Sequence, residues 1–351
     1  MRNQRSKWDA FLEALLPGET PVTFLMMLFC VATYLLGALQ THLLWESDGA
    51  ALLRMGANFG PQTMAGGEWW RLATYAFLHG GIIHLVFNMM ALKNLGPLVE
   101  VRLGSARFGA VYAVASVAGG VGSLVSGTAL SVGASGAVTG LIGAGIIIGH
   151  LTPGAMAKNI RDQLIFWLGI NLLIGFMPGS GLNIDNGAHI GGLIGGAALG
   201  WLFLTLERRA PGFTRAARIP LGLLPVAMVV ALGWQFYQMR NVAPIRGGAA
   251  ALGEAGEEAL MRSCFEELEA ERWSEAERPC GTWRYAVPDR TIPYRTIPYL
   301  IMAALYEQLG QPGRAGRERN LIVALAPDAA DMADLNLTPP ERIKVYLAAS
   351  R

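Results

Sequence analysis

Charged residues are scarce in this chain of 351 residues. Aspartate, glutamate, lysine and arginine make up 15% of it, whereas soluble domains average about 25%. None of the four occurs between Phe108 and Ala157, a run long enough for two membrane passes of about 20 residues each. This excludes an ordinary soluble protein. The net charge of +2 and the placement of basic residues in short loops also argue against a nucleic-acid-binding surface.

Cysteine is also rare, with three residues in the chain. Cys30 lies in an apolar run, where we expect a packing role. Cys264 and Cys280 lie in the last third, which holds more than half of the charged residues and is predicted to be soluble. If this part is outside the cytoplasm, the two thiols could form a disulfide. Two free buried thiols fit the sequence equally well.

Apolar segments predict an all-α integral membrane protein with seven spans. We divide the chain into an N-terminal segment (1–21), a six-helix core (22–206), a loop with a seventh transmembrane helix (207–240) and a small helical soluble tail (241–351). No small-residue cleavage site follows the first apolar run, so we expect it to remain as a span. The spans are predicted at residues 22–39, 80–99, 108–125, 135–150, 163–177, 187–206 and 219–236.

Lysine and arginine are concentrated in alternate loops, which predicts the orientation in the membrane. The basic residues of the N-terminal segment and of three short loops outnumber those of the intervening loops, where Arg54 and Arg71 are the two present. The N-terminus is therefore expected in the cytoplasm of a bacterial-type cell. Seven spans then place the tail outside the cytoplasm.

Helices are also predicted in the soluble tail and in the N-terminal segment. In the tail, residues 257–272 and a broken pair at 299–326 have helical spacing, and the tandem repeat at 290–299 is predicted to be an extended linker. In the N-terminal segment, apolar residues at helical spacing predict a short helix on the membrane surface.

Four polar residues are predicted at one depth of the membrane. Ser135 opens the fourth span, His84 and Asn88 lie in the first turns of the second, and His189 lies in the first turn of the sixth. These spans all enter from the outer face, and a helix rises about 1.5 Å per residue. Each residue alone could be a packed or hydrogen-bonded membrane residue. Their agreement in depth instead favours a functional site.

The residue types fit acyl transfer. A serine hydroxyl becomes a nucleophile when a base removes its proton, and a neutral imidazole is the usual base near neutral pH. The transition state also needs hydrogen-bond donors for its oxyanion. His84 and Asn88 are four residues apart and share one helix face. Asp185, in the loop before His189, is the only acid near this layer, so we predict a Ser–His dyad without a buried acid.

Residues 68–196 resemble the rhomboid family of intramembrane serine proteases. The motifs that carry the resemblance follow the order of the family along the chain. They are Trp70-Arg71 with Thr74, Phe77 and His79, then His84-x-x-x-Asn88, Glu100-x-x-x-Gly104, Gly133-x-Ser135-Gly136 and Ala188-His189-x-Gly191-Gly192.

The resemblance implies a role for each matching residue. Ser135 would be the nucleophile and His189 the general base, while His84, Asn88 and the Ser135 N–H would form the oxyanion hole. The supporting residues would be Gly133 and Gly136 beside the nucleophile, Trp70 and Arg71 in the first loop, Glu100 tying helix ends, and Gly192 letting the fourth and sixth helices touch. Thr139 departs from the family pattern, which often has an aromatic residue stacked on the catalytic imidazole.

These expectations define a function and its rivals. The predicted activity is serine endopeptidase cleavage in or next to transmembrane helices of other proteins, in contact with membrane lipid and with no cofactor or metal. A water-filled cavity open to the outer face would supply the water. The tail is a candidate for binding clients or partners. The rivals are a non-proteolytic rhomboid-like binding or escort factor, and a small transporter, whose polar site would lie nearer the midplane.

Overall fold

The structure is a computed structural model whose described residues form helices joined by turns, bends and loops, with isolated bridge residues besides. The described residues are 18, 20–41, 44–45, 47, 49–65, 67–128, 130–177, 184–210, 218–238, 260–286, 297–325 and 338–349. The predicted surface helix at the N-terminus lies outside them. The chain forms two compact units, residues 1–35 with 72–232 and residues 36–71 with 233–351.

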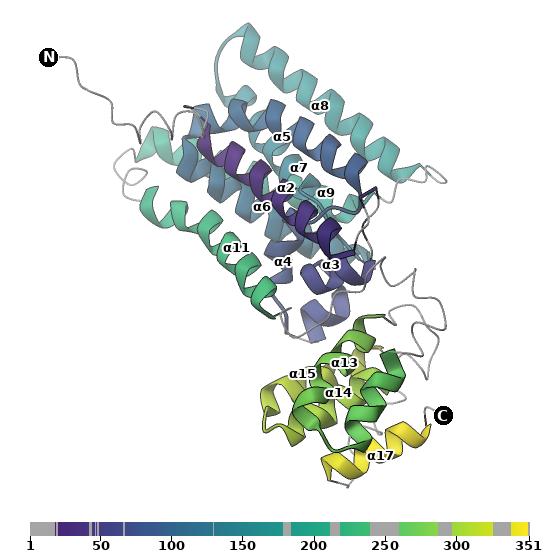
Figure 1. Ribbon diagram of the computed structural model, residues 1–351. Helices are drawn as coiled ribbons and strands as arrows, with labels where there is room; N and C mark the ends of the chain where they lie inside the picture. The colour runs from purple at the N-terminus through teal and green to yellow at the C-terminus, as the bar shows by residue number, and fades with distance from the viewer. Residues whose placement is uncertain are drawn as a thin grey trace, which may run out of the picture. The chain divides into compact units, whose positions relative to one another are not determined.

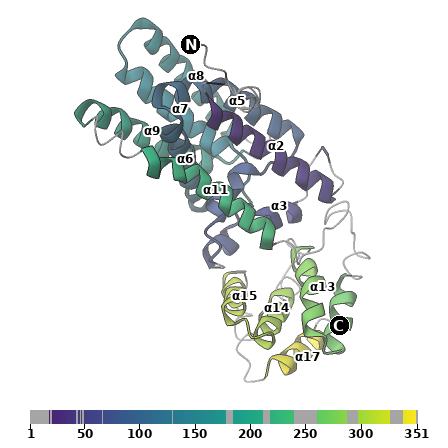
Figure 2. The same ribbon diagram turned by 60° about the vertical axis from the view of Figure 1, so that its left-hand side comes forward.

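A helix occurs at each predicted span, because each apolar run is bounded by glycine, proline or polar residues. Figures 1 and 2 show these helices in one bundle. They are α2 (Pro21–Thr41), α5 (Ile82–Leu103), α6 (Ser105–Ser126), α7 (Ser135–Leu151), α8 (Ala155–Phe176), α9 (Asn186–Arg209) and α11 (Arg218–Gln238).

Four of these helices, α2, α5, α6 and α9, are long and apolar enough to cross a membrane. The apolar stretches of α7 and α11 are shorter, and α8 carries charges near its start. Leu164 is the single buried residue of α8, whereas Phe166 and Trp167 are exposed. This helix therefore contacts the bundle along a narrow strip. The number of seven spans stays a prediction.

Glycine lets α9 approach α6 and α7 at backbone distance. A β-carbon at Gly192 would overlap the carbonyl oxygen of Gly136, and one at Gly196 would overlap that of Gly140. On the other side, a β-carbon at Gly191 would overlap the carbonyl oxygen of Ala118 on α6. Small residues at such positions are the usual means of close helix packing where no hydrophobic effect drives association.

Glu100 joins the start of α2 to the junction between α5 and α6. Its carboxylate, 1% exposed, accepts hydrogen bonds from the backbone N–H groups of Val22 and Thr23 at 3.0 and 2.8 Å. The hydroxyl groups of Thr23 and Ser105 donate at 2.7 and 2.6 Å. One buried carboxylate thus satisfies the free N–H groups at the start of α2 and holds the α5–α6 junction.

The tail has its own hydrophobic core. A helix at 260–269 packs with α13 (Trp273–Ala286), α14 (Ile297–Gln308), α15 (Pro312–Leu325) and α17 (Pro339–Ala349). At α17, the N–H and hydroxyl of Thr338 both donate to Glu341. This capping box lowers the pKa of the Glu341 carboxyl, because it hydrogen-bonds the charged form.

Two tail predictions have different outcomes. The helix pair at 299–326 is confirmed as α14 and α15, which are separated by a turn at Gly310. The linker prediction is wrong at its end, because residues 297–299 form the buried first turn of α14. Residues 287–296 lie outside the described residues.

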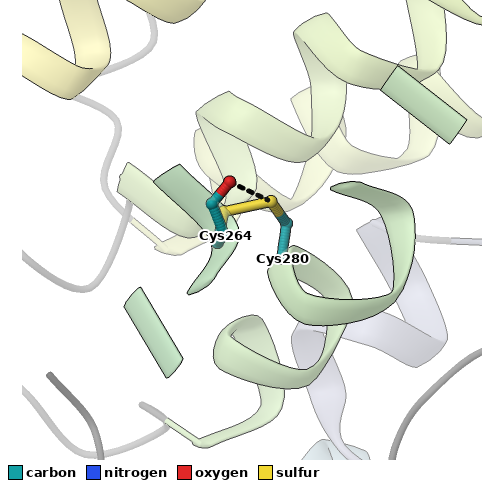
Figure 3. Close-up of a disulfide and its surroundings, with 2 residues drawn as sticks. All are labelled: Cys264 and Cys280. Atoms are coloured by element: carbon teal, nitrogen blue, oxygen red, sulfur yellow. Dashed lines mark hydrogen bonds between the residues drawn. A yellow bond between two sulfur atoms is a disulfide. The ribbon is translucent and has the colours of Figure 1, made fainter. Parts of the chain in front are cut away.

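Cys264 and Cys280 form a disulfide, which decides between the two alternatives that the sequence left open. Figure 3 shows the bond between the helix at 260–269 and α13. Both cysteines belong to the tail core, where Phe265 packs edge-to-face on Trp283. Such a bond persists in oxidising compartments.

The glycine contacts predict that Gly196→Ala destabilises the bundle. The added methyl overlaps a backbone carbonyl that cannot rotate away, so we expect a loss of about 1–3 kcal/mol of unfolding free energy. Gly169→Ala on α8 is the matched control, because a methyl there meets nothing within 4 Å. Thermal unfolding of the two purified variants measures the difference. Equal melting temperatures would show that α7 and α9 are not held this closely.

The disulfide predicts the thiol reactivity of the denatured chain. Alkylation without reductant should modify Cys30 alone, since it is the free cysteine, and prior reduction should expose two more thiols. Mass spectrometry of the alkylated peptides reads both states. Modification of Cys264 and Cys280 without reduction would contradict the bond.

Candidate active site

Ser135 begins α7 after a turn that requires glycine. Gly133 has a φ of +126°, which side chains rarely adopt, and its N–H donates to the carbonyl oxygen of Tyr75 at 3.0 Å. The first hydrogen bond of the helix runs from the N–H of Val138 to the carbonyl of Ala134. The N–H groups of Ser135 and Gly136 precede that bond. They lie at a helix N-terminus, which favours negative charge.

The imidazole of His84 lies against this turn. A β-carbon at Gly133 would stand 2.8 Å from Cε1 and Nε2 of His84 and 3.7 Å from Oγ of Ser135. The absence of a side chain at Gly133 therefore leaves room for the His84 ring beside the turn that carries Ser135. The ring also touches that of His79 edge-on, with centroids 5.1 Å apart.

The hydrogen bond at the other side of the ring assigns its proton. Nδ1 of His84 accepts from the N–H of Gly80 at 3.4 Å. A neutral imidazole has one acceptor and one donor nitrogen, so this contact favours the tautomer with the proton on Nε2. The donor thus lies on the side of the ring that faces Gly133 and Ser135.

Asn88 is one turn further along α5 and is buried. Its amide donates to the carbonyl oxygen of His84 at 2.9 Å. A primary amide has two N–H groups, so one remains for a second acceptor. The two residues are thus joined to each other as well as sharing a helix face.

His189 lies in the first turn of α9 and is 4% exposed, and the backbone of this turn contacts α7. The carbonyl oxygen of Ala188 would stand 3.3 Å from a β-carbon at Gly136, and Gly192 meets the carbonyl oxygen of that same glycine. The turn that carries the imidazole therefore packs on the turn that begins at Ser135. Within the described residues, Nδ1 of His189 has no hydrogen-bond partner.

Asp185 caps the helix that carries His189. Its Oδ1 accepts from the N–H of Ala188 at 2.9 Å and from the hydroxyl of Thr128 at 3.1 Å. One carboxylate oxygen thus starts α9 and ties it to the end of α6. The sequence offered a signal for this cap, since aspartate before an apolar helix is typical of an N-cap.

Thr139 takes part in α7 itself. Its hydroxyl hydrogen-bonds the carbonyl oxygens of Ser135 and Gly136 at 3.0 and 2.9 Å. It lies opposite Gly192, where a β-carbon would be 3.1 Å from its oxygen. Its short side chain is thus part of the surface on which α9 packs.

Three predicted supporting residues have their contacts elsewhere. The guanidinium of Arg71, with a fully buried side chain, donates to the carbonyl oxygens of Leu53 and Ala57 and pairs with Glu68. It holds the first loop together, around α3 (Gly49–Met55). Trp70 is half-buried in the same loop. Glu100 lies roughly 24 Å along α5 from His84, at 1.5 Å per residue. Among the described residues, no group of three or more His, Cys, Asp or Glu could hold a metal ion.

Comparison with known proteins identifies the family. Residues 66–206 match the Rhomboid domain. Putative rhomboid protease YdcA of Bacillus subtilis (strain 168) is 34% identical over 192 residues, which cover 54% of this chain and 90% of that protein. The chain belongs to the rhomboid family. The resemblance seen in the sequence is thereby confirmed, and the protein is an all-α integral membrane protein.

Longer relatives match over part of their length. Rhomboid protease GluP of Bacillus subtilis (strain 168) is 36% identical over 234 residues, 64% of this chain and 43% of GluP. RHOMBOID-like protein 5 of Arabidopsis thaliana is 37% identical over 161 residues, 44% of this chain and 50% of that protein. The rhomboid chain described here thus spans about half the length of these two relatives.

The cap on α9 predicts different effects for two substitutions at Asp185. Asp185→Ala removes the acceptor of the Ala188 N–H and should cost about 1 kcal/mol of unfolding free energy. Asp185→Asn keeps an acceptor oxygen and should cost less. Thermal unfolding of the purified variants tests this order. If asparagine were as damaging as alanine, the charge of Asp185 and not its cap would be the stabilising feature.

Proposed function

We propose that this rhomboid protein is a serine endopeptidase that cleaves peptide bonds in or next to transmembrane helices of other proteins. One observation carries the proposal. The imidazole of His84 and the hydroxyl of Ser135 both lie within 4 Å of the β-carbon position of Gly133, while Gly136 and Gly192 join the Ser135 turn to the turn bearing His189. This packing of three helix starts supports the assignment of Ser135 as nucleophile, His189 as base and His84 as oxyanion donor.

The proposed reaction assigns each group a step. His189 takes the proton of the Ser135 hydroxyl as Oγ attacks the substrate carbonyl carbon. The negative oxygen of the tetrahedral intermediate accepts from Nε2–H of His84, from the second amide N–H of Asn88 and from the N–H of Ser135. His189 then protonates the leaving amine as the C–N bond breaks. Water, activated by His189, hydrolyses the acyl-enzyme and restores the Ser135 hydroxyl.

The substrate class follows from the surroundings of the site. A transmembrane helix keeps its carbonyl groups in internal hydrogen bonds, so it must unwind locally before Ser135 can attack. Segments with glycine, proline or other weak helix formers should therefore be preferred. The family resemblance adds a small residue before the cleaved bond.

Two findings support the proposed orientation, with the N-terminus in the cytoplasm and the tail outside. The tail contains the Cys264–Cys280 disulfide, which fits an oxidising compartment. Residues 36–71 and 233–351 also belong to one compact unit. The seven-span topology puts the first loop and the tail on the same side, as such a unit requires.

Replacing the two proposed catalytic residues tests the function. The wild type should cleave a model transmembrane substrate in liposomes, and Ser135→Ala and His189→Ala should each lower the rate by at least about 10³-fold. Gly169→Ala is the control for an exposed change in the same bundle. Gel analysis of the products measures cleavage. If the Ser135 and His189 variants cleaved at the wild-type rate, the dyad would be wrong. If no variant cleaved but all bound the substrate, the non-proteolytic rival would be favoured.

A further inference from the structure

Tyr75 is buried at the centre of the bundle, 1% exposed, in the short helix η2 (Tyr75–Phe77) before α5. It is not part of the site as the sequence predicted it. Its main-chain carbonyl hydrogen-bonds the turn before Ser135. Its side-chain hydroxyl hydrogen-bonds α6, next to the first turn of α7.

The main chain of Tyr75 holds the turn before the nucleophile. Its carbonyl oxygen accepts from the N–H of Gly133 at 3.0 Å. Gly133 is two residues before Ser135, at the strained position that lets His84 approach. The hydrogen bond fixes this turn against η2, which leads directly into the helix of His84.

The hydroxyl of Tyr75 lies where three helices meet. It donates to the carbonyl oxygen of Ser116 on α6 at 2.9 Å. A β-carbon at Gly119 would stand 2.8 Å from Oη and 2.9 Å from the carbonyl oxygen of Ala188. A β-carbon at Gly136 would stand 3.0 Å and 3.3 Å from the same two oxygens. The hydroxyl is therefore hydrogen-bonded to α6 and lies beside Gly136 in the first turn of α7. The peptide before His189 lies beside the same two glycines.

The side chains of the proposed site give the His189 imidazole no hydrogen bond among the described residues. The hydroxyl of Thr139 bonds its own helix, so this side chain is committed to α7. Nδ1 of His189 has no partner among the described residues. The place of the imidazole then depends on where the backbone of α9 lies against α7. A displacement of 1 Å at a catalytic group can lower a rate by about 100-fold.

We propose that Tyr75 is a positioning residue, whose hydroxyl keeps the Ser135 turn and the His189 turn in register. The inference rests on the proposed function, which assigns Ser135 and His189 to the reaction. Tyr75 itself touches no reacting atom. It acts through the backbone of three helices.

Tyr75→Phe tests the role, because it removes the hydroxyl and keeps the ring and the main-chain hydrogen bond. We expect kcat per active site to fall by about 10-fold, with KM within twofold of the wild type. A fluorophosphonate that labels Ser135 counts the active sites, so that a misfolded fraction does not lower the measured rate. Tyr112→Phe is the matched control: Tyr112 is buried on α6 beside Phe77, with ring centroids 6.5 Å apart, and should keep the wild-type kcat.

A second variant covers the case in which Tyr75→Phe does not fold. Gly119→Ala places a methyl group 2.8 Å from Oη and should lower kcat per active site in the same way. Where both fold, the double variant should be impaired by less than the product of the two single effects, because both changes disturb the junction of Tyr75, Gly136 and Ala188.

The outcomes separate this inference from the proposed function. An unchanged kcat per active site in Tyr75→Phe, or an equal fall in Tyr112→Phe, would overturn the positioning role while wild-type cleavage stands. If the wild type did not cleave at all, the proposed function would fail. The positioning role of Tyr75 would then be tested by the rate at which the fluorophosphonate labels Ser135. Slower labelling in Tyr75→Phe than in the wild type would support the role, and an equal rate would overturn it.

Discussion

Helices α7 and α9 approach so closely that a β-carbon on Gly192 would overlap the carbonyl oxygen of Gly136. No side chain separates the two backbones there, so the first turns of both helices have one relative position. Ser135 begins one of these turns and His189 lies in the other. In a membrane, where lipid competes equally for apolar surface, such close packing replaces the hydrophobic effect as the force that joins helices. The proposed site depends on this contact.

The residues of the proposed site lie at the N-terminal ends of helices. His84, Ser135 and His189 lie in the first turns of α5, α7 and α9. Each start carries N–H groups without a helical acceptor and the positive end of a helix dipole. An arrangement of three such ends favours negative charge, which is what an oxyanion needs. The polar side chains among them keep defined partners, such as Gly80 for His84 and Ala188 for Asp185.

Other buried contacts stabilise parts of the protein away from the proposed site. Glu100 fastens α2 and α5 far from Ser135, and Arg71 organises the first loop through backbone carbonyl groups. Burial makes each of these charges dependent on its partners, since an unpaired charge in a dry interior is costly. The tail is stabilised separately, by its own core and by the Cys264–Cys280 disulfide.

The sequence by itself determined the helices and the family, because apolar runs and short motifs are local properties. The common depth of Ser135 and His189 stays a prediction from the constant rise per residue. It left the cysteine pairing open and placed the start of α14 in a linker, since both depend on the tail core. The role of Tyr75 was decided by the tertiary structure alone. Tyr75 lies in a stretch that the sequence predicts as a loop, where no periodic pattern marks it. The neighbours of its hydroxyl come from helices far apart in the sequence, so the folded structure is needed to identify them.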